Sequence, residues 1–215
     1  MTNPVPSRPA EGPGRRDRKK TETRHALRQA AHRLFAEQGF AQTTIEDITD
    51  AADVSRRTFF RYYSSKEDLL QADIADLLPR MTDALLARPA DEPPVTAILA
   101  ALRTLIGPDG VPALGGSLAG PAAGIRARLG LVRLLVQWEQ GIADTLLARR
   151  GLSPGQAPEA ERLRAVVTAC AATSALRSSV QIYRGRYGGN GLDAERLVPI
   201  IEQAFAVLAS GFSGS

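Results

Sequence analysis

Apolar residues recur at helical spacing along most of the chain. In residues 21–38 they occupy positions i, i+3, i+4, i+7 and i+8 of a single stripe, namely Leu27, Ala30, Ala31, Leu34 and Phe35. Gly39 follows this stripe, and glycine is typical of the left-handed position just past a helix end. No segment shows a convincing alternation of apolar and polar residues, as a half-buried strand would. The pattern therefore predicts an all-α protein.

Short capped helices are predicted next. Thr44 caps a second helix that ends near Asp53, and Ser55 caps a third helix that reaches Tyr63. A fourth helix follows, for which Ser64 and Glu67 are expected to form a capping box. Pro79 lies inside the apolar pattern of this fourth helix, so we expect a kink or an early end there.

The remainder of the chain also has helical spacing. Helices are predicted over residues 94–106, 125–149 and 159–184. The last predicted helix carries one stripe of large apolar residues, at Val198, Ile201, Phe205, Leu208 and Phe212. Residues 107–121 are rich in glycine and proline and are expected to form a long loop, and 185–191 a turn. Residues 1–16 have almost no bulky apolar side chains and are expected to form a disordered arm.

Positive charge is concentrated in the first third of the chain. Residues 1–66 hold 13 Lys and Arg against 8 Asp and Glu, whereas the remaining residues hold 14 against 15. This asymmetry is typical of a segment that binds a polyanion, attached to a neutral body. The alternative at this stage is a basic tail plus a solvated helix face.

Composition excludes several classes of protein. No apolar run approaches the roughly 18 residues that span a bilayer, and the polar N-terminus does not resemble a secretory signal. Cys170 is the single cysteine, so an intramolecular disulfide is excluded and a cytoplasmic location is expected. His25 and His32 stand seven apart rather than four, which disfavours a metal site. With no catalytic motif either, we expect no enzyme, cofactor or metal.

The second and third helices, separated by a tight turn, have the shape of a helix-turn-helix. The third would be the recognition helix, with three arginines, two hydroxyl side chains and two tyrosines in residues 55–63. Phe59 and Tyr63 are expected to face inward. The remaining large side chains would face DNA: Arg56, Arg57, Phe60, Arg61 and Tyr62. The alternative is a small amphipathic helix whose arginines are only solvated.

This region resembles the TetR family of transcriptional regulators. The matching stretches are LFAEQGF at 34–40, TTIEDI at 43–48, AADVSRRTFFRYY at 51–63 and SSKEDLL at 64–70. The resemblance implies a DNA-binding domain over residues 17–66 and a helical ligand-binding and dimerisation domain over 67–215. It also implies a palindromic double-stranded DNA operator, a homodimer, a repressor function and a small-molecule effector of apolar character.

The resemblance further implies individual roles. Thr44 and Lys66 match positions that contact phosphates, and Arg56 and Arg57 match positions that read bases. The positions that contact the DNA backbone or base methyl groups correspond to Thr58, Phe60, Arg61 and Tyr62, and Ser55 is a further expected DNA-binding residue. Two residues depart from the family pattern. Asp53 replaces the usual glycine of the turn, and Phe60 replaces a frequent tyrosine.

The second half is less distinctive. The small residues of 159–184 and the final apolar stripe are candidates for a four-helix interface between two subunits, or alternatively for the core of a monomer. Candidates for a ligand pocket are Trp138, Glu139, Cys170 and Tyr183, each of which is otherwise an ordinary core residue. The start of the 125–149 helix weakly resembles a subgroup with an acyl-CoA-like ligand-binding domain.

Three hypotheses follow from the sequence. The first is a ligand-responsive dimeric repressor. The second is an architectural DNA-binding protein without a ligand, and the third is a helical enzyme or binding protein with an incidental basic helix. A gel-shift titration at several salt concentrations distinguishes them.

Overall fold

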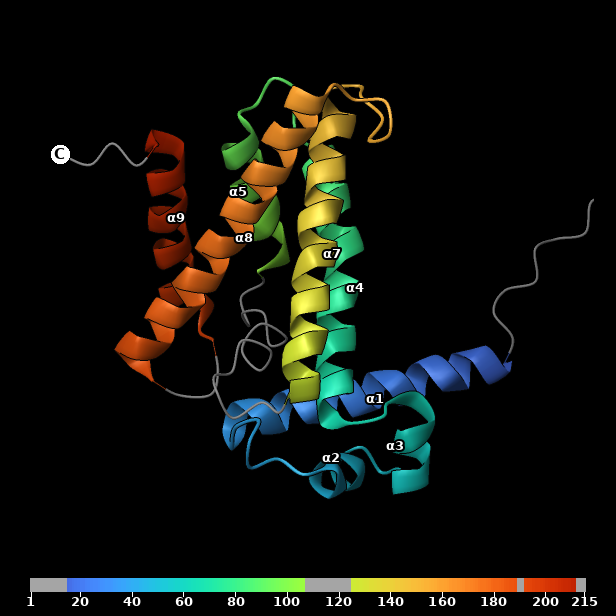
Figure 1. The fold of residues 1–215 in the computed structure, drawn as a ribbon. Coiled ribbons are helices and arrows are strands. Elements are labelled where there is room, and N and C mark those ends of the chain that lie inside the picture. Colours follow the sequence, from blue (N-terminus) through green and yellow to red (C-terminus); the bar gives the residue numbers. More distant parts are fainter. Residues whose placement is uncertain (1–14, 107–124, 189–191, 212–215) are drawn as a thin grey trace, which may run out of the picture.

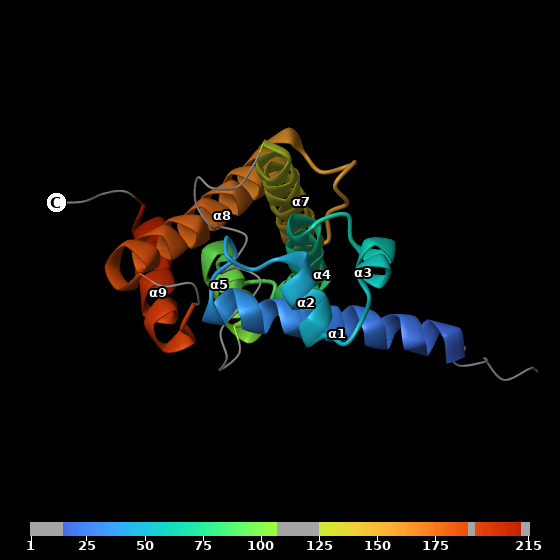
Figure 2. The same ribbon diagram turned by 90° about the horizontal axis from the view of Figure 1, so that it is seen from below.

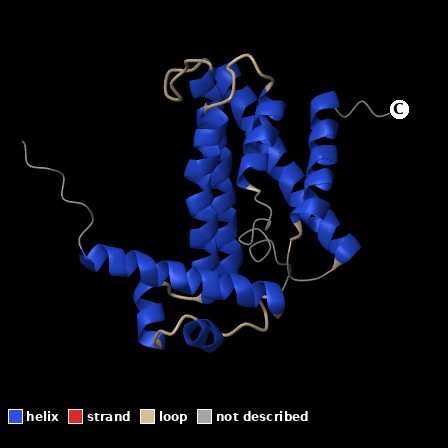
Figure 3. Ribbon diagram, turned by 180° about the vertical axis from the view of Figure 1, so that it is seen from behind, coloured by secondary structure: helices blue, strands red, loops and turns tan. Residues whose placement is uncertain are grey.

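The computed structural model describes residues 15–106, 125–188 and 192–211, and these ranges contain helices and no strand (Figure 3). The all-α prediction is therefore confirmed for the described part of the chain. Its helices are α1 (Arg15–Glu37), α2 (Ile45–Ala51), α3 (Arg56–Tyr62), α4 (Lys66–Leu86), α5 (Pro94–Leu105), α7 (Ile125–Arg149), α8 (Glu159–Tyr187) and α9 (Ala194–Ser210).

The first three helices form one end of the molecule. Helix α1 lies across this end with α2 and α3 beneath it, and α4 rises from it side by side with α7 (Figure 1). Seen from below, α2 and α3 lie nearest to the viewer, in front of the bundle (Figure 2). Helix α8 crosses obliquely beside α7, and α9 packs against α8 at the outer edge. We call residues 15–70 the head and the described residues from 74 onward the body.

Two hydrophobic cores organise these parts. The head core is made of nine buried side chains: Leu27, Ala30, Ala31, Phe35, Ile48, Phe59, Tyr63, Leu69 and Leu70. The body core collects buried side chains from α4, α5, α7, α8 and α9, with Ile74, Met81 and Leu85 as the contribution of α4. Helix α4 thus belongs to both cores, which divide between Leu70 and Ile74. The domain boundary predicted after Lys66 falls at the first residue of this shared helix.

Two helices extend further than the apolar pattern predicts. Helix α1 begins at Arg15 rather than near Thr21, so the last two residues of the predicted arm are helical, and residues 1–14 lie outside the described part. Arginine and lysine are good helix formers that need no apolar stripe. Helix α8 continues through Gly185 to Tyr187, and its C-cap Gly188 has a φ of +63°. The turn predicted from Gly185 is therefore wrong for residues 185–187.

Helix α4 also differs from the prediction in two details. Ser65, not Ser64, is its N-cap, because the Ser65 hydroxyl accepts the N–H of Asp68 at 3.1 Å. The carboxylate of Asp68, not that of Glu67, accepts the Ser64 N–H at 2.8 Å, so the capping box predicted for Ser64 and Glu67 is wrong. The helix also continues through Pro79 to Leu86, so the expected early end is wrong. Burial of Met81 and Leu85 stabilises the turns beyond the proline.

The remaining helix predictions agree with the structure within a few residues. The predicted ranges 94–106 and 125–149 correspond to α5 and α7, and the final stripe corresponds to α9. Val198 to Leu208 of that stripe lie on α9, whereas Phe212 lies outside the described residues. The predicted loop over 107–121 also lies outside them.

The turn between α2 and α3 depends on a left-handed residue. Asp53 has a φ of +51°, and no other non-glycine residue of the described part has a positive φ. Aspartate tolerates this conformation better than most residues, because its short polar side chain bonds locally. Asp53, which stands where the resembling family usually has glycine, therefore still allows the turn.

Substitutions at Asp53 test this conformation. We expect Asp53→Ala to lower the free energy of unfolding by roughly 1 kcal/mol, because a left-handed backbone is costly for an ordinary side chain. Asp53→Gly should be at least as stable as the native chain, because glycine has no Cβ to clash. Urea denaturation followed by circular dichroism measures both variants. Equal stability of the alanine and glycine variants would contradict a left-handed turn.

Candidate nucleic-acid interface

The cap of α2 is a reciprocal pair of hydrogen bonds. The Thr44 hydroxyl accepts the N–H of Asp47 at 3.1 Å, and the Asp47 carboxylate accepts the N–H of Thr44 at 2.8 Å. These bonds to Thr44, with smaller contributions from Gln38 and Lys66, hold the pKa of Asp47 below its usual value. The predicted cap is confirmed, and Asp47 is the partner that sequence reasoning missed. Its place three residues after Thr44 was the available signal.

Helix α3 is capped in the same way by Ser55. The Ser55 hydroxyl accepts the N–H of Thr58 at 3.1 Å and lies 2.9 Å from the Thr58 hydroxyl. Both hydroxyl groups, predicted to contact DNA, are therefore also part of the local structure that starts the helix. The predicted cap of the third helix is confirmed.

The two faces of α3 differ in character. Phe59 is fully buried and Tyr63, just past the helix, is nearly so, with their ring centroids 5.7 Å apart in the head core. The opposite face is exposed and carries Arg56, Arg57, Phe60 and Arg61. The inward directions of Phe59 and Tyr63 and the outward directions of these four residues agree with the structure. Tyr62, which was also expected to face DNA, is instead partly buried and packs against the head core, because it lies one position before Tyr63 at the end of the helix. Phe60 is 48% exposed.

The exposed side chains of α3 are ordered by contacts among themselves. The Arg56 guanidinium forms an ion pair with Glu46 of α2 and lies 5.9 Å from the centre of the Phe60 ring. The Arg61 guanidinium lies 4.8 Å from the Tyr62 ring and donates to its hydroxyl at 3.0 Å. Arg56 is thus held between α2 and α3. The sequence pattern did not predict this ion pair, because Glu46 lies ten residues before Arg56 and on another helix.

Lys66 has a different environment from the other predicted DNA contacts. Its ammonium donates to the carbonyl oxygens of Phe40 at 2.6 Å, Thr43 at 2.7 Å and Ala41 at 3.3 Å. It also lies 4.6 Å from the centre of the Phe40 ring. The residue is half-buried against the loop between α1 and α2.

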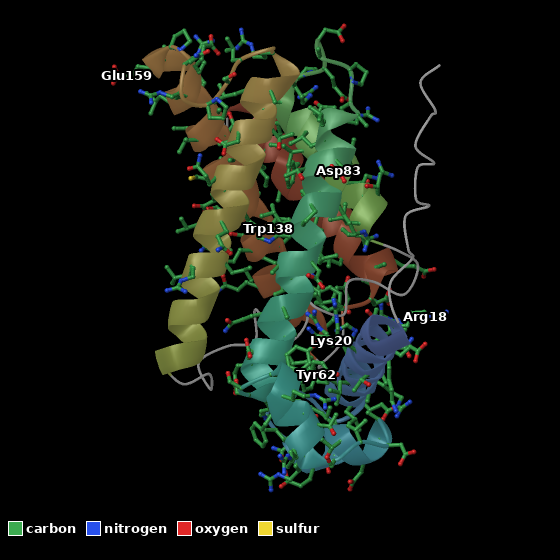
Figure 4. The ribbon with its side chains drawn as sticks, turned by 90° about the vertical axis from the view of Figure 1, so that its right-hand side faces the viewer. Arg18, Lys20, Tyr62, Asp83, Trp138 and Glu159 are labelled. Atoms are coloured by element: carbon green, nitrogen blue, oxygen red, sulfur yellow. The ribbon has the colours of Figure 1, made fainter. Side chains whose placement is uncertain are left out.

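The N-terminal half of α1 is a basic helix that projects beyond α3 in Figures 1 and 2. Its exposed cationic side chains are Arg18, Lys19, Lys20 and Arg24. Figure 4 labels Arg18 and Lys20 on this helix. This basic segment is therefore helical from Arg15 onward.

The four candidate ligand contacts of the body separate into three places. Trp138 is buried between α7 and α4, where its indole N–H donates to the Ile74 carbonyl at 3.3 Å (Figure 4). Glu139 accepts the Thr173 hydroxyl at 3.3 Å and lies beside Cys170, between α7 and α8. Tyr183 is buried near the start of α9, and its hydroxyl accepts the N–H of Asp193 at 3.1 Å. Only Glu139 and Cys170 come together.

The described residues contain neither a metal-binding cluster nor a candidate membrane-spanning helix. No group of three histidine, cysteine, aspartate or glutamate side chains is arranged to hold a metal ion. No described helix combines the length and apolarity that crossing a membrane requires.

Comparison with known proteins identifies the head. Residues 27–72 match the family model described as bacterial regulatory proteins, tetR family. The HTH-type transcriptional regulator TcmR of Streptomyces glaucescens is 42% identical over 96 residues, which are 45% of this chain and 42% of TcmR. The chain thus matches less than half the length of this curated relative.

Solved structures resemble the whole fold. The fatty acid degradation regulator FadR from Bacillus halodurans has a TM-score of 0.59 at 16% identity, covering 95% of this chain and 100% of that one. FadR of Thermus thermophilus, a TetR family repressor in complex with lauroyl-CoA, has a TM-score of 0.55 at 24% identity, covering 89% and 96%. At these identities the likeness shows a shared fold.

The reactivity of Cys170 tests the contact between α7 and α8. Burial and, to a smaller extent, the nearby Glu139 raise the pKa of the Cys170 thiol. Since the thiolate is the reactive form, iodoacetamide should alkylate Cys170 more slowly near pH 8 than it alkylates free cysteine. Glu139→Gln should speed the reaction moderately, because one of the two causes is removed. Mass spectrometry follows the single thiol.

The matched control for this prediction is Glu202→Gln, which removes a carboxylate from α9 instead. It should leave the alkylation rate of Cys170 unchanged. A Glu139→Gln rate identical to that of the native chain would show that Glu139 does not act on the thiol.

Proposed function

We propose that the chain belongs, through its helix-turn-helix domain, to the TetR family of transcriptional regulators and that it is a dimeric, DNA-binding repressor. A small-molecule ligand releases it from a palindromic operator. It acts in the cytoplasm, where a chain with one cysteine requires no disulfide.

The observation that carries this proposal is the two-faced helix α3. Phe59 anchors the helix in the head core, while three arginines of the same seven-residue helix face solvent. Arginine binds guanine through two hydrogen bonds in the major groove and also binds phosphates. We assign base reading to Arg56 and Arg57. We assign contacts with the DNA backbone or with base methyl groups to the neighbouring residues Thr44, Ser55, Thr58, Phe60, Arg61 and Tyr62.

A second subunit is proposed to cover the outer faces of α8 and α9. These two helices leave large apolar side chains exposed, namely Leu163, Val166, Val167, Ile182 and Val207. Exposed apolar groups of this number favour burial against a partner. A dimer also presents two copies of α3, one for each half of a palindrome.

The body is proposed to bind a ligand with an acyl chain. Support comes from the fold shared with FadR of T. thermophilus, which was solved with lauroyl-CoA. Glu139 and Cys170 are the proposed ligand contacts that lie close together, with Trp138 and Tyr183 on other walls of the body core. Release requires that the ligand prefer the conformation with low affinity for the operator.

Loss of both base-reading arginines should abolish specific binding. The double variant Arg56→Ala/Arg57→Ala is expected to weaken binding to operator DNA by at least about 30-fold, since each bidentate base contact is worth about 1–3 kcal/mol. The probe is a palindrome that the native chain selects from a random-sequence pool, and gel shift measures the affinity. Circular dichroism should show an unchanged melting temperature, because both side chains are exposed.

The double variant Arg80→Ala/Arg133→Ala is the matched control, because it removes two exposed arginines from the body. It should bind the operator like the native chain. Full operator affinity in the Arg56/Arg57 variant would show that α3 does not read DNA. Binding of every DNA with equal affinity by the native chain would favour an architectural protein, and no binding at all would favour a helical enzyme or binding protein.

Lauroyl-CoA tests the proposed ligand. We expect it to lower operator affinity by roughly 5–150-fold, the usual range of allosteric coupling. It should also change the fluorescence of Trp138, the single tryptophan, in a saturable way. Coenzyme A without an acyl chain is the control and should do neither. If lauroyl-CoA leaves both signals unchanged, the ligand is of another class.

A further inference from the structure

The contacts of Lys66 assign it a role in positioning rather than in DNA contact. We propose that Lys66 is the residue that fixes the α1–α2 loop to the start of α4 and thereby sets the position of α2 and α3 for operator recognition. The inference rests on the proposed DNA-binding function and identifies a specificity-determining residue within it.

The ammonium of Lys66 is already occupied. A lysine has three N–H donors, and here they serve the carbonyls of Phe40, Ala41 and Thr43. The Phe40 ring, which itself packs on Phe35 with centroids 5.0 Å apart, lies 4.6 Å from the same nitrogen. A phosphate contact would therefore require Lys66 to exchange strong, partly buried bonds for a solvated one.

The loop held by Lys66 is a short link with internal order. It leaves α1 at Gly39, which has a φ of +89°, and the Thr43 hydroxyl donates to the Gly39 carbonyl at 2.8 Å. Thr43 itself is almost fully buried. Because three carbonyls of this loop point at one ammonium, the loop cannot shift without breaking charge-assisted bonds. It leads directly into Thr44 and α2.

Helix α2 transmits this position to the recognition helix. Glu46 of α2 pairs with Arg56 of α3, and Ile48 packs with Phe59 in the head core. A displacement of α2 relative to α4 therefore changes the direction of Arg56. Loss of the Lys66 bonds should reduce binding to the correct sequence more than binding to DNA in general.

Lys66→Met tests this role in the full-length chain, because methionine keeps an apolar stem but has no donor. Affinity is measured at a series of salt concentrations for the selected palindrome and for a scrambled duplex of equal length. We expect operator affinity to fall on the order of 10-fold and scrambled affinity to stay within about two-fold. The slope of log affinity against log salt should not change, because no phosphate contact is lost.

Arg80→Met is the matched control, because it removes an exposed positive charge from the body part of the same helix. It should leave both affinities unchanged. A contact between Lys66 and phosphate gives the opposite pattern for Lys66→Met. In that case both duplexes bind more weakly and the slope falls by about 0.9 for each lost contact. That result, or unchanged operator affinity, would overturn the proposal.

Amide hydrogen exchange without DNA separates this proposal from the proposed function. In Lys66→Met, amides of residues 43–47 should exchange at least about 10-fold faster, while those of α5 and α9 keep their native rates. If the native chain selects no operator, the proposed function fails, and the exchange data still decide whether Lys66 holds the loop. Unchanged exchange at 43–47 would overturn that role.

Discussion

The structure depends on one helix that belongs to two hydrophobic cores. Leu69 and Leu70 of α4 complete the core of the head, and Ile74 begins its contribution to the core of the body. At 1.5 Å per residue, the two sets of contacts are only about 6 Å apart along the helix axis. Trp138 of α7 donates its indole N–H to the carbonyl of Ile74, where the cores divide. The body therefore holds α4 directly beside the head. A displacement of either part changes the position of α4 and so displaces the other part.

The head is small, so polar contacts fix much of the arrangement of its helices. A core of nine buried side chains leaves few apolar constraints on the short helices α2 and α3. Hydroxyl caps at Thr44, Ser55 and Ser65 start three successive helices. Lys66 and the left-handed Asp53 then fix the two loops around α2. Each of these features acts on backbone groups, and the large side chains on the outer face of α3 remain exposed.

Local signals predicted the helices and two caps, whereas contacts between distant residues could not be predicted. The inward direction of Phe59 and Tyr63 followed from their spacing of four, as in any helix. The cap of α4 was placed one residue early because two adjacent serines each have an acidic residue three positions later. Trp138 and Tyr183 were expected to line one pocket, but they lie in different places. The rotation of a long helix about its axis decides where each side chain lies, and this rotation is set by packing against neighbouring helices. The bonds of Lys66 span more than 20 residues, which no local pattern encodes.

The sharing of α4 has a consequence for building chimeric regulators from this chain. A junction placed after Lys66, where the motif ends, would give Leu69 and Leu70 to the foreign body and leave the head core incomplete. A junction between Leu70 and Ile74 keeps the buried side chains of each core in their own half. The chain is then joined within α4, between the two sets of core contacts. The unit that can be exchanged is thus defined by buried side chains, and it is longer than the helix-turn-helix by the first turn of the helix that follows.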